Sequence, residues 1–193
     1  MRRSLFLAVA FGFLVAERSL HRILSLEALG GASPGFMGSL VVFVSLFAPR
    51  KQALWACWFL GVLMDLVSGY AWGTGAPVMV VGPNALGYVL VCFFVLQLRT
   101  MVFRRRVLTM GALTAGGMIL SGLVVVMMLS IRSWYPETVS PHYFAKSSAL
   151  GEMIYRIVIA LYSGLLAVPL GWVLLATLPW WKFEALGHRR TWR

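Results

Sequence analysis

The sequence predicts an all-α membrane protein, a bundle of six transmembrane helices that occupies the whole chain as one domain. Of the 193 residues, 60% are hydrophobic and only 12% are charged, against ~25% charged residues in soluble domains. The mean hydropathy is +0.84. The apolar residues gather in separate blocks, and short basic clusters lie between the blocks. This composition excludes a soluble globular domain, a disordered chain and a secreted disulfide scaffold.

The expected spans are derived from the apolar blocks. They cover about residues 4–17, 32–48, 53–72, 77–98, 107–129 and 153–178. A straight helix needs ~20 apolar residues to cross the hydrocarbon core, and the last three blocks reach this length unaided. The first three reach it only with flanking residues, so five spans and one partly inserted segment is the alternative. After the first span, Leu20, Ile23 and Leu24 recur at helical spacing, and we expect this helix to continue along the outer interface.

The basic residues predict the orientation. With the N-terminus inside, twelve of the 17 Lys and Arg residues fall in inner segments, four in outer ones and Arg156 within the last span. The positive-inside rule then makes both termini of this multi-pass protein cytoplasmic. The N-terminus imitates a signal peptide but lacks its cleavage site, so we expect the first helix to be retained. Arg104, Arg105 and Arg106 form a cytoplasmic basic cluster that should face anionic lipid or cytoplasmic partners, and nucleic acid is not an expected partner.

The sequence carries no set of residues that indicates catalysis. The three histidines are scattered, no two carboxylates share an apolar block, and metalloprotease, hydrolase and phosphate-loop motifs are missing. Cys57 and Cys92 lie inside apolar blocks without the spacing of a metal site or a disulfide framework. We therefore expect a protein that is not an enzyme and that has neither a cofactor nor a metal.

Small residues recur at every fourth position in four of the expected spans. In the first span the stripe consists of Ser4, Ala8, Gly12 and Ala16. Helices associate in lipid through such stripes, because their backbones can approach closely there. The stripes predict close helix packing, either within the bundle or against a helix of a partner protein, and the sequence leaves both interpretations open.

Asp65 is the one acidic residue inside an expected span and away from the ends of that span. An unpaired carboxylate at mid-membrane costs ~3 kcal/mol or more, so Asp65 requires a partner or water. A structural interpretation bonds it to the turn at residues 68–75, and a functional one makes it a coupling, binding or proton site. Arg156 is a candidate ion-pair partner at similar depth. Arg156 could equally extend to the surface or pair with Glu152, one turn earlier.

The stretch around Asp65 resembles a family signature. It runs Gly61-Val62-Leu63-Met64-Asp65-Leu66-Val67-Ser68-Gly69-Tyr70-Ala71-Trp72-Gly73. A glycine, three apolar residues, Asp-Leu, a Ser-Gly pair and a further glycine are similar to the signature of the bacterial rod shape-determining protein MreD family. A basic turn before the stretch, a long span after it and a second basic connection occur in the same order. The resemblance covers about residues 53–106. It assigns a structural and partner-binding role to Gly61, Asp65, Ser68, Gly69 and Gly73.

The resemblance implies a function as well as a fold. The implied fold is similar to the six-helix substrate-binding subunits of energy-coupling-factor transporters. The implied function is that of a non-enzymatic inner-membrane scaffold in the machinery that elongates the peptidoglycan wall and maintains rod cell shape. Its partners would be an MreC-like bitopic membrane protein, RodA with its transpeptidase, and MreB.

Two alternative functions would require other features of the sequence. A small-ligand-binding membrane subunit of a transporter would need a sizeable polar cavity open to the outside, lined by Asp65, Asn84 and Arg156. A membrane enzyme that acts on lipid-linked sugars would need paired acids or histidines on one side of the membrane, and the sequence lacks them.

Overall fold

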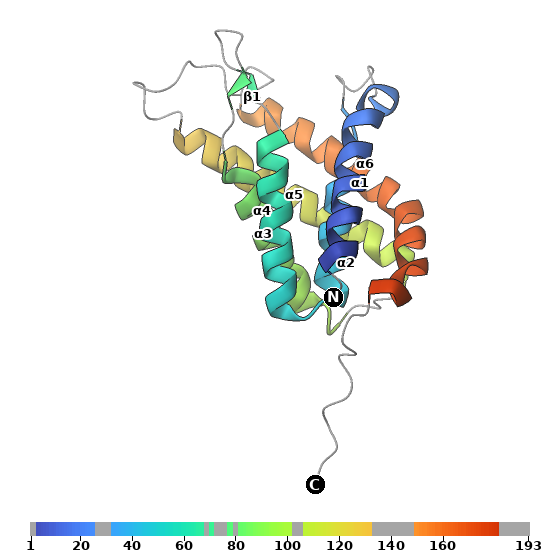
Figure 1. The fold of residues 1–193 in the computed structure, drawn as a ribbon. Coiled ribbons are helices and arrows are strands. Elements are labelled where there is room, and N and C mark those ends of the chain that lie inside the picture. Colours follow the sequence, from blue (N-terminus) through green and yellow to red (C-terminus); the bar gives the residue numbers. More distant parts are fainter. Residues whose placement is uncertain are drawn as a thin grey trace.

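The computed structural model describes residues 3–25, 32–67, 70–71, 77–78, 81–101, 106–132 and 149–181. These residues form a helical bundle, as the sequence predicts, with one short strand pair (Figure 1). The helices are α1 (Arg3–Leu24), α2 (Phe36–Phe47), α3 (Arg50–Val67), α4 (Pro83–Leu98), α5 (Val107–Arg132), α6 (Ala149–Ala176) and the 3-10 helix η3 (Leu178–Trp181). β1 (Tyr70–Ala71) pairs with β2 (Pro77–Val78) in antiparallel fashion.

Two helices are shorter than the spans expected from the sequence, and the strand pair lies between them. The apolar blocks predict a span through residue 72 and the next span from residue 77, but α3 ends at Val67 and α4 begins at Pro83. Pro83 occupies the first turn of α4, where its missing N–H removes no intrahelical hydrogen bond and its fixed φ angle suits a helix. α1, in contrast, continues to Leu24, as its spacing predicts.

α2 forms the centre of the bundle. Its residues from Phe36 to Leu46 are all buried, and it contacts each of the other five α-helices. Apart from Ser39 and Ser45 the helix is apolar on every side, which is typical of a helix that lies in a protein core or in lipid. Its 12 residues extend about 18 Å, less than the ~30 Å hydrocarbon core. Enclosure by longer helices explains how so short an apolar helix is accommodated.

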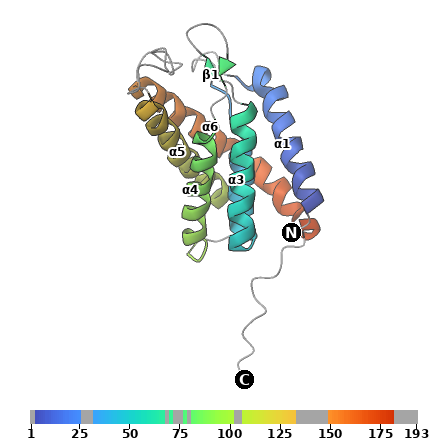
Figure 2. The same ribbon diagram turned by 60° about the vertical axis from the view of Figure 1, so that its left-hand side comes forward.

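α3 and α4 run antiparallel beside each other, with β1 beyond their adjoining ends (Figure 2). Cys57 on α3 and Cys92 on α4 are both buried and free. The Cys57 sulfur lies 3.5 Å from the hydroxyl of Ser45 on α2. Arg99 is the C-cap of α4. Its guanidinium donates a hydrogen bond to the carbonyl of Ala48, the C-cap of α2, at 3.1 Å. A cation at this position also interacts favourably with the negative end of the α2 dipole.

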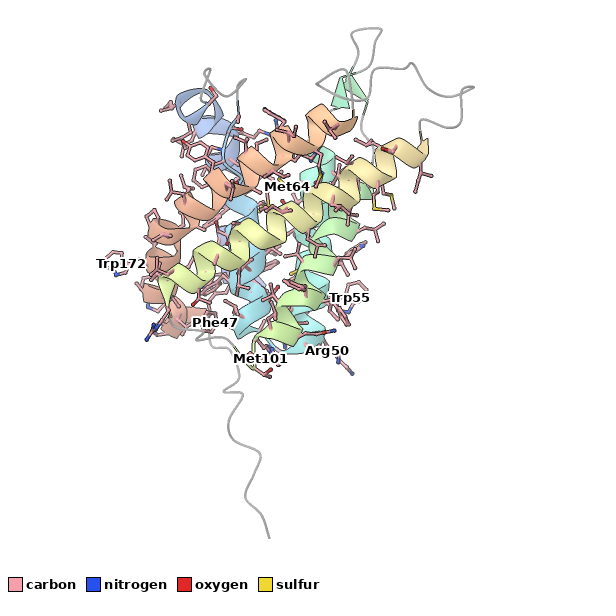
Figure 3. All side chains as sticks on the ribbon, turned by 180° about the vertical axis from the view of Figure 1, so that it is seen from behind. Phe47, Arg50, Trp55, Met64, Met101 and Trp172 are labelled. Carbon is pink, nitrogen blue, oxygen red and sulfur yellow. The ribbon has the colours of Figure 1, made fainter. Side chains whose placement is uncertain are left out.

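α5 and α6 lie side by side and run obliquely across the other helices (Figures 1 and 3). Within the described residues, two segments are long and apolar enough to cross a membrane, Val107–Ile131 and Leu150–Ala176. α2 and α4 are shorter apolar helices.

The contact between α5 and α6 depends on glycine. A Cβ atom on Gly164 would lie 2.6 Å from the Cβ of Ala115 and 3.0 Å from the carbonyl oxygen of Gly111. We therefore expect Gly164→Ala to lower the free energy of unfolding in detergent micelles by about 1–3 kcal/mol, because the helices must separate. Gly116 on α5 has nothing within 4 Å of its Cβ position. Gly116→Ala should be neutral or stabilise by up to ~1 kcal/mol, and equal losses for both variants would contradict this packing.

Candidate functional site

The stretch that carries the family resemblance lies partly on α3. Gly61 and Asp65 are one turn apart on this helix and are both buried, whereas Ser68, Gly69 and Gly73 lie outside the described residues. Gly61 faces α4, where a Cβ atom would lie 2.4 Å from the Ala85 Cα. Glycine is required at this position because the backbones of α3 and α4 approach too closely for a side chain.

The Asp65 carboxylate accepts four hydrogen bonds from the start of α4. Its Oδ2 accepts from the backbone N–H groups of Gly82 at 2.8 Å and Ala85 at 3.1 Å. Its Oδ1 accepts from the backbone N–H of Asn84 at 3.0 Å and from the Asn84 side-chain amide at 2.9 Å. The N-cap residue of α4 is Gly82, with φ +132°, and it has no side chain to cap the helix. Asp65 therefore caps α4 from the neighbouring helix, with its charge against the positive end of the helix dipole.

This geometry favours the structural interpretation of Asp65 and gives it a partner that the sequence analysis did not name. The sequence left Asp65 and Glu152 open as ion-pair partners of Arg156, and the structure has the pair with Glu152. Glu152 lies one turn earlier on α6, with its Oε1 3.0 Å from the Arg156 Nε. Asp65 needs no cation, since the exposed N–H groups of a helix start carry partial positive charge.

A second acidic residue, which the sequence patterns do not single out, caps a helix in a similar way. Glu17, on α1, accepts a hydrogen bond at Oε2 from the backbone N–H of Met37 in the first turn of α2, at 3.0 Å. α2 also begins after a glycine, Gly35, which gives it no side-chain cap. The Gly35 N–H donates to the hydroxyl of Ser163 on α6 at 2.7 Å. In both helix pairs an acid on one helix caps a second helix that starts after glycine.

A polar cavity of about 210 Å³ lies near these two capped helix ends. Its polar lining residues are Glu17, Ser33, Asn84, Tyr88, Ser121 and Arg156. The cavity is large enough for several water molecules. Of the residues expected to line a ligand cavity, Asn84 and Arg156 line it, whereas Asp65 binds Asn84 without lining the cavity itself.

The small-residue stripe of α1 faces away from the bundle. Its members are Ser4, Ala8 and Gly12, which are exposed, and Ala16, which is half-buried. Nothing lies within 4 Å of a Cβ atom placed on Gly12. The other face of α1 carries Phe6 and Ala10, which are 6% and 1% exposed and pack into the core. α1 therefore has one face in the bundle and a second face outside it, on which the small-residue stripe lies beside the exposed Phe11 and Val15.

The stripes of the other helices serve contacts within the bundle. Gly61 meets the backbone of α4, and Gly111 on α5 meets Gly164 on α6. A Cβ atom on Gly171, in the stripe of α6, would lie 3.3 Å from the Met110 sulfur on α5. The α1 stripe differs from these because it has no such neighbour.

The structure describes only part of the basic cluster that the sequence predicts to be cytoplasmic. Arg106 is exposed next to the start of α5, and Arg104 and Arg105 lie outside the described residues. In the part of the chain that the structure describes, no three His, Cys, Asp or Glu side chains are grouped so as to hold a metal ion.

Comparisons of the chain with protein-family models, with curated proteins and with solved structures found no match.

Proposed function

We propose that this protein is a non-enzymatic scaffold of a bacterial inner membrane that holds the transmembrane helix of a partner protein. The surface of the bundle supports a membrane location. Large apolar side chains project from its sides, and Phe11, Leu165 and Trp172 are 66%, 72% and 70% exposed. In Figure 3, Trp55 and Trp172 project from opposite sides of the bundle. An apolar surface of this extent is stable in lipid and would cause aggregation in water.

The observation that carries the proposal is the outward stripe of α1. Ser4, Ala8 and Gly12 form an exposed stripe of small residues on a helix whose other face is fixed in the core through Phe6 and Ala10. In lipid, large apolar side chains gain little by moving from lipid to protein, and helix association depends on close backbone approach at small residues. The α1 face therefore suits one further helix, supplied by another chain.

The resemblance of residues 61–73 to the MreD family suggests the partner. An MreC-like protein is bitopic, so it has one transmembrane helix to place on α1. The proposed role is then in the elongation machinery that builds the lateral peptidoglycan wall, with RodA, its transpeptidase and MreB as further partners. In this proposal the bundle crosses the membrane six times with both termini in the cytoplasm. Gly61 and Asp65 act by fixing α3 against α4.

Gly12→Leu tests the proposal. We expect the variant to abolish co-purification of an MreC-like partner in mild detergent, because a leucine side chain would hold the two backbones apart. The thermal unfolding of the variant itself should match the original protein, since the Gly12 Cβ position is empty. Rod-shaped cells that depend on this variant should become round.

Gly171→Leu is the matched control on a buried stripe. Its side chain would meet Met110 and Val107 on α5, so this variant should lower the unfolding temperature of the monomer itself. Unchanged partner binding by a folded Gly12→Leu variant would contradict docking on α1. Turnover of a lipid-linked sugar by the purified protein would contradict the scaffold function.

The polar cavity favours one second candidate function, a small-ligand-binding subunit of a transporter. Glu17 and Arg156 place opposite charges on the cavity wall, which suits a small polar ligand. Mass spectrometry of the solutes released when freshly purified protein is denatured distinguishes the two functions. A stoichiometric small molecule, lost in Arg156→Leu, would favour the transporter subunit. Solvent and lipid alone would favour the scaffold.

A further inference from the structure

An open pocket of about 360 Å³ lies between the N-terminal parts of α1 and α3. It is lined by Arg3, Phe6, Lys51, Gln52, Trp55 and Ala56. α1 and α3 begin at the same end of the bundle, away from β1 (Figures 1 and 2). The pocket does not share a residue with the polar cavity at the other end or with the outward stripe of α1.

Among the described residues of the pocket wall, the two charged ones are both positive. Arg3 is the first residue of α1, Lys51 is the second of α3, and both are exposed. Neither helix has an acidic residue in its first turn. The positive end of a helix dipole repels cations and attracts anions, so two cations at two helix starts produce a strongly positive pocket. Its electrostatic complement is an anion.

The rest of the wall is apolar and aromatic. Phe6 packs its ring against Phe59, with centroids 6.3 Å apart, and Trp55 is 71% exposed beside Trp58. A second groove, of about 610 Å³, is lined by Lys51, Leu54, Trp55, Trp58 and Val89. Lys51 and Trp55 thus line both hollows, and apolar surface continues from the cations along either side of Trp55.

We propose that this pair of hollows binds one anionic phospholipid. Its phosphate lies between Arg3 and Lys51, one acyl chain follows Phe6 and Trp55, and the other follows Trp58 and Val89. Basic pockets between transmembrane helices on the cytoplasmic side bind anionic headgroups. Free phosphate would satisfy the cations but leave the aromatic walls uncovered. The proposal rests on the membrane location given above and does not depend on the partner protein.

Native mass spectrometry of the purified chain tests the proposal, with phosphatidylglycerol and phosphatidylcholine of identical acyl chains as probes. We expect one phosphatidylglycerol to be retained in preference to phosphatidylcholine and not to be displaced by inorganic phosphate. Each cation close to an anionic headgroup contributes about fivefold in affinity, so Arg3→Ala with Lys51→Ala should weaken phosphatidylglycerol binding about 30-fold. Trp55→Ala should weaken the binding of both lipids.

Two controls separate a defined site from general attraction to a basic protein. Exchanging the cations, Arg3→Lys with Lys51→Arg, keeps both charges and should retain the lipid. Arg106→Ala removes an exposed cation outside the pocket and should also retain it. The proposal is overturned if Arg106→Ala and Lys51→Ala weaken binding equally, if inorganic phosphate displaces the lipid, or if the two lipids bind equally. Thermal unfolding of each variant verifies that the bundle remains folded.

Discussion

Asp65→Leu is expected to lower the free energy of unfolding by on the order of 4 kcal/mol and to remove most of the folded monomer from membranes. The substitution leaves the backbone N–H groups of Gly82, Asn84 and Ala85 without the acceptor that the structure gives them. Asp65 is fully buried, and an orphaned donor costs about 1–3 kcal/mol where water cannot replace the acceptor. The measurement is unfolding in mixed micelles with increasing denaturing detergent.

Asp65→Asn is the informative control for this prediction. Each carboxylate oxygen accepts two hydrogen bonds, and an amide keeps only one of these acceptors. We therefore expect Asp65→Asn to lose about half as much stability as Asp65→Leu, on the order of 2 kcal/mol. If both variants unfold like the original protein, Asp65 does not cap α4, and the functional interpretation of this carboxylate gains support.

Gly61→Leu is expected to prevent the close contact of α3 and α4. Even a Cβ atom on Gly61 would lie 2.4 Å from the Ala85 Cα and 2.8 Å from the Asn84 carbonyl oxygen. These are backbone atoms of α4 and cannot move aside without displacing the helix. Overpacking by a single methyl group typically costs 1–3 kcal/mol, so we expect Gly61→Ala to lose about 2 kcal/mol and Gly61→Leu to yield no folded monomer. Membrane yield and unfolding in micelles measure both effects, with Gly116→Ala as the neutral control.

Gly61 and Asp65 act on the same contact, so their effects should not add. Ala85 both abuts Gly61 and donates its N–H to Asp65. Once Gly61→Ala has displaced α4, Asp65→Asn should lower the free energy of unfolding by a smaller amount. We expect the double variant to be more stable than the sum of the single losses predicts, by at least about 0.5 kcal/mol. Strict additivity would indicate that the two residues stabilise separate parts of the bundle.

The helical fold could be predicted from the sequence because the apolar blocks fix where the helices lie. The central position of α2 was not predictable, since an apolar segment with Ser39 and Ser45 as its polar residues suits lipid as well as a protein core. The boundaries near residue 72 and residue 77 were wrong because the hydropathy of a block does not reveal whether its ends are helical. Pro83 indicates the start of α4 better than hydropathy does, because proline favours the first turn of a helix.

The polar contacts of the site were harder to predict, because they join segments that are distant in the sequence. The need of Asp65 for a partner followed from solvation energetics alone, but its donors, Gly82, Asn84 and Ala85, are positioned by the packing of α3 on α4. Glu17 was missed because it follows an apolar block and resembles an ordinary surface acid. The sequence feature that indicates a capping role for another residue is Gly35 at the start of the next block, because a helix that begins after glycine has no side-chain cap of its own.

The direction of the small-residue stripes was not predictable from spacing. The spacing of Ser4, Ala8 and Gly12 shows that they share a face of α1, and Gly61 shares a face of α3 with Asp65 in the same manner. In a membrane protein both the core and the lipid are apolar, so composition does not reveal which face turns inward. The three-dimensional packing makes this distinction, and it leaves the α1 stripe open to another chain.

Disulfide crosslinking in living cells tests docking on α1 most directly. Cys57 and Cys92 are first replaced by alanine, and single cysteines are introduced on α1 and along the transmembrane helix of an MreC-like partner. Ala8→Cys and Gly12→Cys are predicted to crosslink to the partner under mild oxidation, whereas Ala10→Cys on the buried face and Leu165→Cys on the exposed side of α6 are predicted not to. Crosslinks at Leu165→Cys without any at Ala8→Cys or Gly12→Cys, or the absence of crosslinks at every position, would contradict the proposed scaffold.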